Sequence, residues 1–211
     1  MQQLLEQSEP YYLDYYALDD APIVKNARVY DLASSVKASK YPMAIDTEAM
    51  TGDIVERTRR LGSSRKGEGH DQFLTGIIVN FDLTFSNKGW VELERYRFMN
   101  FVSSQSTMHR ITRFEFDAQC NEYVHEGVRE ILKGLIEEYN ANPSPEKYLE
   151  ILNSNPAGFQ LTARLTTNYR QLKTIYAQRK NHRLPEWRTF CQWIEELPHF
   201  KELTMHSVKE G

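Results

Sequence analysis

The stretch IIVNFDLTF at positions 77–85 constrains the fold most, because apolar and polar side chains alternate along its length. Successive side chains of a strand point to opposite faces, so the apolar ones share a single face. These apolar residues are Ile77, Val79, Phe81, Leu83 and Phe85. A second alternating stretch, FQLTARLT, follows at 159–166. Both stretches predict strands, and the first has one buried face.

Helical periodicity covers much of the remaining chain. Between residues 122 and 139 the apolar positions recur at intervals of three and four, which predicts a long amphipathic helix. Further helices are predicted at 47–61, 87–99, 168–181 and 185–197, with a short one beginning near Pro145. The segment ITRFEFD at 111–117 predicts another strand. Residues 1–211 are therefore expected to form one mixed α/β domain.

The first 25 residues differ in composition from the rest of the chain. They are acidic and rich in tyrosine, and prolines interrupt them. We interpret residues 1–25 as an irregular segment laid on the body of the domain at a subunit contact. The tyrosines are expected to pack there rather than to take part in chemistry.

Composition excludes several classes of function. A formal net charge of −3 does not favour nucleic-acid binding. No run of about 18 apolar residues is present, so no membrane span is expected. The first residues lack the basic start and apolar core of a secretory signal, and a cytoplasmic protein is expected. Cys120 and Cys191 are far apart and lack metal-ligand spacing, which suits a reducing compartment.

The usual catalytic motifs are absent from the sequence. There is no GxSxG elbow, no GxxxxGK[ST] phosphate loop and no HExxH zinc motif. Both cysteines are expected to be packing residues, since free cysteine is commonly buried. Arginine is the remaining functional side chain, and its planar fork suits phosphates and other planar anions. A merely solvated, charged helix face is the competing interpretation.

The segment ERYRFMNFVSSQSTMHR at 94–110 makes an anion site the favoured interpretation. Two arginines flank one tyrosine, and hydroxyl side chains follow before His109 and Arg110. On the helix predicted at 87–99, Arg95 and Arg97 point about 200° apart. They are therefore expected to contact two ligands, or a ligand and a neighbouring subunit.

This segment resembles the signature of the flavin-dependent thymidylate synthase (ThyX) family, RHRxxSxNEQSxRY. Both arginines and the Gln105–Ser106 step are kept if one residue is inserted. Upstream, GHDQFLTG from Gly69 is similar to the family's GHxxPFEH stretch. Downstream, Asn168-Tyr-Arg170 and then Arg179 keep the family's spacing, and LPEWR resembles its terminal AQxEIR box. The resemblance covers residues 69–188.

The resemblance implies a fold, a reaction and a set of binding residues. The fold is an α+β domain with a largely antiparallel sheet and packed helices, assembled as a homotetramer whose sites are shared between subunits. The reaction is reductive methylation of dUMP at C5, with methylene-tetrahydrofolate as carbon donor and with FAD reduced by NADPH. The implied FAD-binding residues are Arg95, Tyr96, Arg97, Asn168, Arg170 and His70. The implied nucleotide-binding residues are Arg179, Ser106, Gln105, His109, Arg110 and Arg188. No residue is expected to act as a nucleophile.

Several positions depart from the family pattern, mostly at nucleotide contacts. Tyr96 replaces the signature histidine, and Met108 replaces the arginine expected at the substrate phosphate. Further departures are Glu92, Thr75-Gly76 and Leu152. Losing a charged hydrogen bond costs about 1.5–3 kcal/mol, so several such losses would abolish ordinary dUMP affinity unless other residues replace them. The flavin contacts are therefore better kept than the substrate contacts. Two alternatives stay open: a flavoenzyme for dCMP, UMP or a hypermodified-base precursor, and a non-methylating flavin- or nucleotide-binding protein.

Overall fold

An antiparallel sheet of five strands forms the centre of the molecule in the computed structural model, which describes residues 15–65 and 67–206. The strand order is β1-β2-β3-β5-β4. The strands are β1 (Tyr15–Ala17), β2 (Val24–Tyr30), β3 (Ile78–Ser86), β4 (Asn100–Ser104) and β5 (Gln160–Asn168). The central pair, β3 and β5, aligns Phe81 with Leu165 and Asp82 with Arg164. The strands predicted at 77–85 and 159–166 are thus confirmed, and they are neighbours.

The alternation in β3 separates a buried face from a polar face. Phe81, Leu83 and Phe85 are fully buried. On the other face, Asp82 pairs with Arg164 of β5 at 3.1 Å, and Thr84 shares a hydrogen bond with Thr162 at 2.8 Å. Cross-strand polar pairs of this kind stabilise a solvated sheet face.

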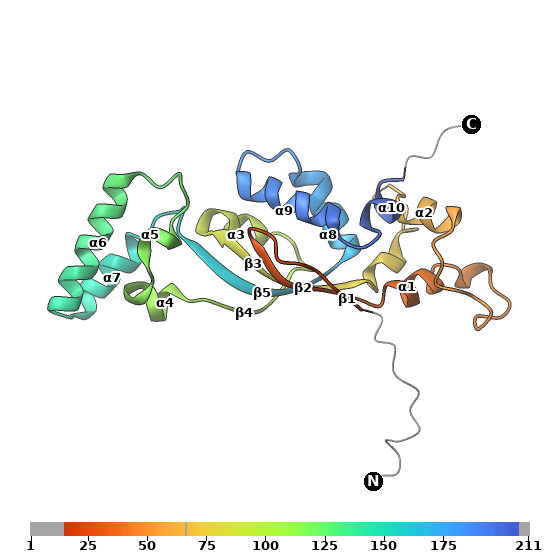
Figure 1. Cartoon of the computed structure of the whole chain (residues 1–211), viewed down its shortest axis with the longest axis horizontal. Coiled ribbons are helices and arrows are strands. Elements are labelled where there is room, and N and C mark those ends of the chain that lie inside the picture. The colour runs from red at the N-terminus through yellow and green to blue at the C-terminus, as the bar shows by residue number, and fades with distance from the viewer. Residues whose placement is uncertain (1–14, 66, 207–211) are drawn as a thin grey trace, which may run out of the picture.

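Helices cover the apolar face of the sheet. Figure 1 shows α3 (Asn87–Leu93), α8 (Tyr169–Arg179) and α9 (Pro185–Glu196) above the strands. The side chains of α9 dominate this contact, because Trp187, Phe190 and Ile194 are fully buried. At one end lie α1 (Leu32–Ala38), α2 (Glu56–Gly62) and α10 (Phe200–Thr204).

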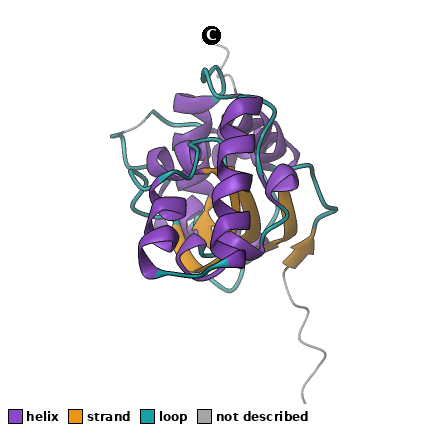
Figure 2. Cartoon of the chain, turned by 90° about the vertical axis from the view of Figure 1, so that its left-hand side faces the viewer, coloured by secondary structure: helices purple, strands orange, loops and turns teal. Residues whose placement is uncertain are grey.

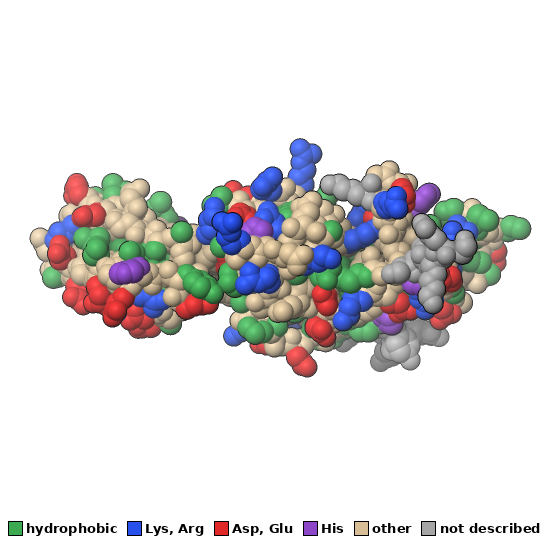
Figure 3. Space-filling model, turned by 90° about the horizontal axis from the view of Figure 1, so that it is seen from above, with side chains coloured by type: hydrophobic (Ala, Val, Ile, Leu, Met, Phe, Trp, Pro, Cys, Tyr) green, Lys and Arg blue, Asp and Glu red, His purple; other side chains and the backbone are tan. Residues whose placement is uncertain are grey.

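A helical lobe extends from the other end of the sheet. It consists of α4 (Thr107–Arg110), α5 (Phe116–Gln119), α6 (Glu126–Ala141) and α7 (Pro145–Asn153). Its own apolar cluster contains Ile111, Phe116, Leu132, Ile151 and Phe159. In Figure 2 the helices of this lobe stand in front of the strands. Figure 3 shows a waist between lobe and body, with acidic side chains gathered on the lobe.

The helix predicted at 122–139 is observed as α6, which begins four residues later than predicted. His125 caps it, since its Nδ1 accepts a hydrogen bond from the Gly127 amide at 3.1 Å. The short helix near Pro145 is α7, and Ser144 caps it in the same way. The helices predicted at 168–181 and 185–197 are observed as α8 and α9. Local periodicity and capping residues were sufficient for these four elements.

The strand predicted at 111–117 is wrong. This segment forms a short 3-10 turn at Ile111–Arg113 and then α5. Both Ile111 and Phe116 are buried in the cluster of the lobe. The apolar residues of the segment alternate because they reach that cluster from successive short turns, and not because the segment pairs with a strand.

The helix predicted at 47–61 is largely wrong as well, since α2 covers only Glu56–Gly62. Before it, the Asp46 carboxylate accepts from the Glu48 amide at 2.9 Å, and the Thr51 hydroxyl donates to Asp53 at 2.7 Å. Such local side-chain bonds compete with helix formation. Val55, directly before α2, is exposed.

The N-terminal prediction is partly outside the described residues, because residues 1–14 are not among them. Tyr15–Ala17 form an edge strand rather than irregular chain, and Val24 already begins β2. Tyr15 stacks on Tyr30 with ring centroids 5.9 Å apart. Within the described part, this segment therefore belongs to the sheet.

Candidate functional site

The site lies along α8, and the junction between β5 and α8 positions it. Asn168 ends the strand and caps the helix, because its Oδ1 accepts a hydrogen bond from the Gln171 amide at 2.9 Å. Tyr169 anchors the first turn, since it is fully buried and its hydroxyl donates to the Pro198 carbonyl at 2.7 Å. Burial strongly raises the pKa of Tyr169, so this hydroxyl stays protonated.

Two adjoining hollows follow the exposed side of α8. The larger, of about 880 Å³, is lined by the loop at 63–65 and by Asp71, Gln72, Asn168, Arg170 and Lys173. The smaller, of about 560 Å³, is lined by Arg95, Tyr96, Arg97 and Arg179. Both hollows share four lining residues: Phe98, Gln171, Thr174 and Gln178. Five of the six predicted flavin-binding residues therefore surround one continuous depression.

Arg95 and Arg97 do not lie on a helix, which corrects the 200° argument. The helix α3 ends at Leu93, and residues 94–99 form a turn that leads into β4. Thr167 of β5 holds this turn, because its hydroxyl donates to the Phe98 carbonyl at 2.7 Å. The turn buries Tyr96 and leaves both arginines exposed.

The exposed arginines are available to an anion. Within residues 15–65 and 67–206, Arg95 and Arg97 form no ion pair or side-chain hydrogen bond. Phe98 beside them is 63% exposed at the junction of the two hollows. Unpaired guanidinium groups next to an exposed aromatic ring can bind a ligand that carries both negative charge and a flat ring.

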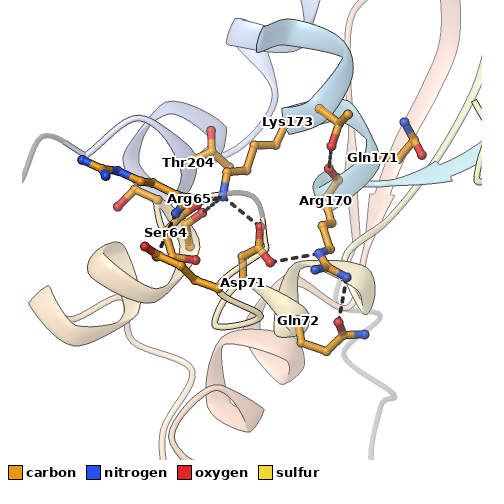
Figure 4. A network of polar contacts seen from close by, with 12 residues as sticks. Ser64, Arg65, Asp71, Gln72, Arg170, Gln171, Lys173 and Thr204 are labelled. Atoms are coloured by element: carbon orange, nitrogen blue, oxygen red, sulfur yellow. Dashed lines mark hydrogen bonds and ion pairs between the residues drawn. The ribbon is translucent and has the colours of Figure 1, made fainter. Parts of the chain in front are cut away.

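Arg170 is held from below by the buried Asp71 and the exposed Gln72, as Figure 4 shows. Its Nε donates to Oδ1 of Asp71 at 2.9 Å, and its Nη1 donates to Oε1 of Gln72 at 2.8 Å. The other carboxylate oxygen of Asp71 accepts from Lys173 Nζ at 2.9 Å. Asp71 is buried, so this carboxylate depends on its two cationic partners.

Arg179 lines the smaller hollow but has internal partners. Its Nε donates to the Tyr96 hydroxyl at 2.8 Å, and its Nη1 pairs with Glu92 Oε2 at 2.7 Å. The guanidinium also lies 4.9 Å from the centroid of the Trp187 ring. His182 contacts the same Glu92 oxygen at 3.1 Å. Arg179 thus lines the smaller hollow with a guanidinium group that Glu92 and Tyr96 already bind.

The remaining predicted residues lie elsewhere on this chain. His70 is exposed in the loop before Asp71. Gln105 pairs with β5, since its Oε1 accepts from the Thr162 amide at 2.8 Å. His109 and Arg110 are exposed on α4, beside the half-buried Ser106. Arg188 lines a separate hollow of about 770 Å³ at the waist, together with Lys88, His125 and Arg183. One chain does not bring these residues to the hollows along α8.

Sequence reasoning missed three residues of the site: Asp71, Lys173 and Phe98. Lys173 follows Arg170 by three residues on α8, so the helical spacing placed the two cations on one face. Asp71 lies in the quoted GHDQFLTG stretch, directly after His70. Its burial, and its bonds across 99 and 102 residues, could not be read locally. Phe98 is exposed because residues 94–99 form a turn instead of the predicted helix.

The two cysteines are buried, and burial makes both thiols harder to ionise. Burial is the main factor that raises the pKa of Cys191 to about 12, and it also raises the pKa of Cys120. A thiol with such a pKa is not a thiolate at neutral pH and is a poor nucleophile. Neither cysteine lines the hollows along α8.

The described part of the chain contains neither a metal-binding cluster nor a membrane-spanning helix. No group of three or more His, Cys, Asp or Glu side chains is arranged to hold a metal ion. None of the helices in residues 15–65 and 67–206 has the length and apolar character needed to cross a membrane.

Comparison with known proteins gives a consistent fold. No family model matches the sequence, and no curated protein matches it. Two solved structures of the flavin-dependent thymidylate synthase ThyX from Helicobacter pylori, each with FAD and dUMP, match the structure. One has a TM-score of 0.62 at 17% identity and covers 86% of this chain and 96% of its own. The other has a TM-score of 0.64 at 16% identity and covers 85% and 94%. The chain therefore has the fold of the flavin-dependent thymidylate synthases.

Proposed function

We propose that the protein is a flavin-dependent enzyme that methylates a pyrimidine nucleotide, with dUMP as the default substrate. One observation carries the proposal: Arg95, Tyr96, Arg97, Asn168 and Arg170 line one continuous depression along α8. This supports a flavin site because Arg95 and Arg97 are unpaired among the described residues and Phe98 supplies an exposed ring. The two solved neighbours contain FAD and dUMP.

The residues of the depression fit FAD in kind. Pockets for organic ligands commonly enclose about 300–1,000 Å³ and contain a few well-placed polar groups. The larger hollow alone is of about 880 Å³. Arg95, Arg97 and Arg170 would bind the negatively charged phosphates of FAD. Asn168 would fix the junction between β5 and α8, because its side chain caps α8. His70 would contribute from the neighbouring loop.

The proposed reaction needs no protein nucleophile. When bound, FAD reduced by NADPH supplies the hydride, and methylene-tetrahydrofolate supplies the carbon that replaces the C5 hydrogen of dUMP. The chain would bind and orient the reactants and would exclude water. Gln105, Ser106, His109, Arg110 and Arg188 would contact the nucleotide from a neighbouring copy, in a homotetramer with shared sites. Arg179 would contact it from the same copy as the depression.

One contact favours a second candidate, a flavoenzyme for a different pyrimidine nucleotide. Glu92 pairs at 2.7 Å with Arg179, which lines the smaller hollow, and neutralises its charge. A carboxylate here disfavours a nearby phosphate but can accept a hydrogen bond from an exocyclic amino group. Such an amino group distinguishes dCMP from dUMP.

Spectroscopy and titration test both candidates. We expect the purified protein to retain a yellow cofactor with an absorption band at about 450 nm. Calorimetric titration with dUMP, dCMP and UMP would then identify the nucleotide. A protein that binds neither FAD nor any of the three nucleotides would contradict the proposal. Flavin binding without turnover on any of them, with NADPH and methylene-tetrahydrofolate supplied, would indicate the non-methylating alternative.

A further inference from the structure

Asp71 connects the end of α2 with the first turns of α8 through Arg170 and Lys173. Its side chain is 7% exposed. One oxygen accepts from Arg170 Nε and the other from Lys173 Nζ, both at 2.9 Å. A carboxylate removed from water in this way is stable only while both cations contact it.

Lys173 has no hydrogen-bonding capacity left for a ligand. Besides Asp71, its Nζ donates to the Gly62 carbonyl at 2.8 Å and to the Ser64 carbonyl at 2.7 Å. An ammonium group has three N–H donors, and all three are used here. Lys173 therefore joins α8 to the end of α2 and places the carboxylate of Asp71.

Arg170 is different, because part of its guanidinium group stays unpaired. Two of its N–H groups are used, one by Asp71 and one by Gln72. A guanidinium group has five N–H donors in a rigid plane, so two fixed bonds define the orientation of the other three. Those three have no partner within the described residues, and Arg170 lines the 880 Å³ hollow. Figure 4 shows its side chain extending from α8 to Asp71 and Gln72.

We propose that Asp71 is a positioning residue, which holds the Arg170 guanidinium in the orientation that binds an anionic group of the ligand. The inference deepens the proposed function and rests on it for the identity of the ligand. Pre-orientation matters because a free arginine side chain loses rotamer freedom when a ligand fixes it, and that loss weakens binding. The charges agree with this role: one carboxylate between two cations leaves one positive charge at the hollow.

The first test measures orientation without any ligand. In the apo-protein, the Nε–H of Arg170 is expected to exchange slowly with solvent, as measured by ¹⁵N NMR of arginine side chains. The variant Asp71→Asn should make this exchange fast, because an amide is a weaker acceptor than a carboxylate. Fast exchange in the wild type would overturn the inference, whether or not a flavin binds.

The second test measures FAD affinity by the quenching of flavin fluorescence. Asp71→Asn is expected to weaken binding by about tenfold to a hundredfold, the equivalent of one charge-assisted hydrogen bond. Arg170→Ala should cause a similar loss, and the double variant should lose little more, because both changes remove the same oriented group. Asp71→Glu keeps the carboxylate and should recover part of the affinity.

Two further variants separate positioning from general stability. Glu202→Gln is the matched control, since Glu202 also accepts from an arginine Nε, that of Arg59 at 3.0 Å, but lies outside the hollow. It should lower the melting temperature without changing FAD affinity. Gln72→Ala removes the second, exposed acceptor of Arg170 and should weaken FAD binding less than Asp71→Asn does. This variant covers the case in which Asp71→Asn does not fold.

The outcomes distinguish the inference from the function on which it rests. Unchanged FAD affinity in Asp71→Asn and Gln72→Ala, or full additivity with Arg170→Ala, would overturn the positioning role. A wild-type protein that binds no flavin or nucleotide would overturn the proposed function. In that case the exchange of the Arg170 Nε–H in the apo-protein still decides whether Asp71 orients the side chain.

Discussion

Individual arginines of the site differ by the partners they already have. Arg179 is 12% exposed and pairs with Glu92, whereas Arg95 is exposed and has no partner among the described residues. Arg179→Ala should lower the free energy of unfolding by about 2–3 kcal/mol, because Glu92 loses a charge-assisted bond and two rings lose a cation. Arg95→Ala should change it by less than about 0.5 kcal/mol. Urea denaturation measures both, and equal effects would contradict the assigned contacts.

The cysteine side chains allow a second prediction at the same scale. Cys191 should not react with a thiol-specific reagent at pH 8 in the native protein, because burial raises its pKa to about 12. The raised pKa also makes the free energy of unfolding depend on pH. The stability contributed by the protonated Cys191 thiol is complete below the ordinary pKa of 9.0 and is lost as pH rises toward 12. The absorbance of the thiol reagent, recorded with and without denaturant, measures how much Cys191 is labelled in the native protein. Rapid labelling of native protein would mean that the thiol is accessible.

Cys120→Ala combined with Cys191→Ala provides the corresponding test of turnover. The proposed reaction uses no protein thiol, so the double variant should keep turnover nearly intact apart from packing losses. A fall of several orders of magnitude, with the fold preserved by circular dichroism, would instead mean that the chemistry is covalent.

Two helical glycines, Gly62 and Gly134, differ in the space around them. A Cβ at Gly62, at the end of α2, would clash with the Leu203 carbonyl of α10. A Cβ at Gly134, in the middle of α6, would meet nothing within 4 Å. Gly134→Ala should therefore stabilise the protein by about 0.5–1 kcal/mol, because alanine loses less backbone freedom in a helix. Gly62→Ala should destabilise it by about 1–3 kcal/mol, since the helices must separate. Thermal melts measure both, and the same sign for the two changes would contradict the packing of α2 on α10.

The whole molecule presents its predicted binding residues on separate surfaces. Those of the flavin lie mainly along α8, His109 and Arg110 are exposed on α4, and Arg188 lines the separate hollow at the waist. A nucleotide site that uses all of them requires more than one copy of the chain. We expect light scattering at micromolar concentration to give four times the 24.8 kDa mass of one chain. A monomer, both with and without FAD, would remove the basis for shared sites.

Much of the fold was predictable because its signals are local. Strict alternation at 77–85 and three-four spacing at 122–139 report which side of an element is buried, and neighbouring residues alone produce those patterns. The prediction failed at 47–61 and 111–117. In the first, short polar side chains bond to nearby residues and prevent the helix. In the second, a few apolar residues fit a small separate cluster.

The sequence by itself determined the two central strands, the four helices α6 to α9, and the arginine-rich segment that resembles a known signature. Only the tertiary structure decided how those arginines are used. Asp71 and Arg170 are 99 residues apart, and Glu92 and Arg179 are 87 apart. Whether an arginine is free for a ligand or paired with a carboxylate depends on which distant residue lies within about 3 Å of it. That distance is set by the packing of α8 against Asp71 and against α3, which no local pattern encodes.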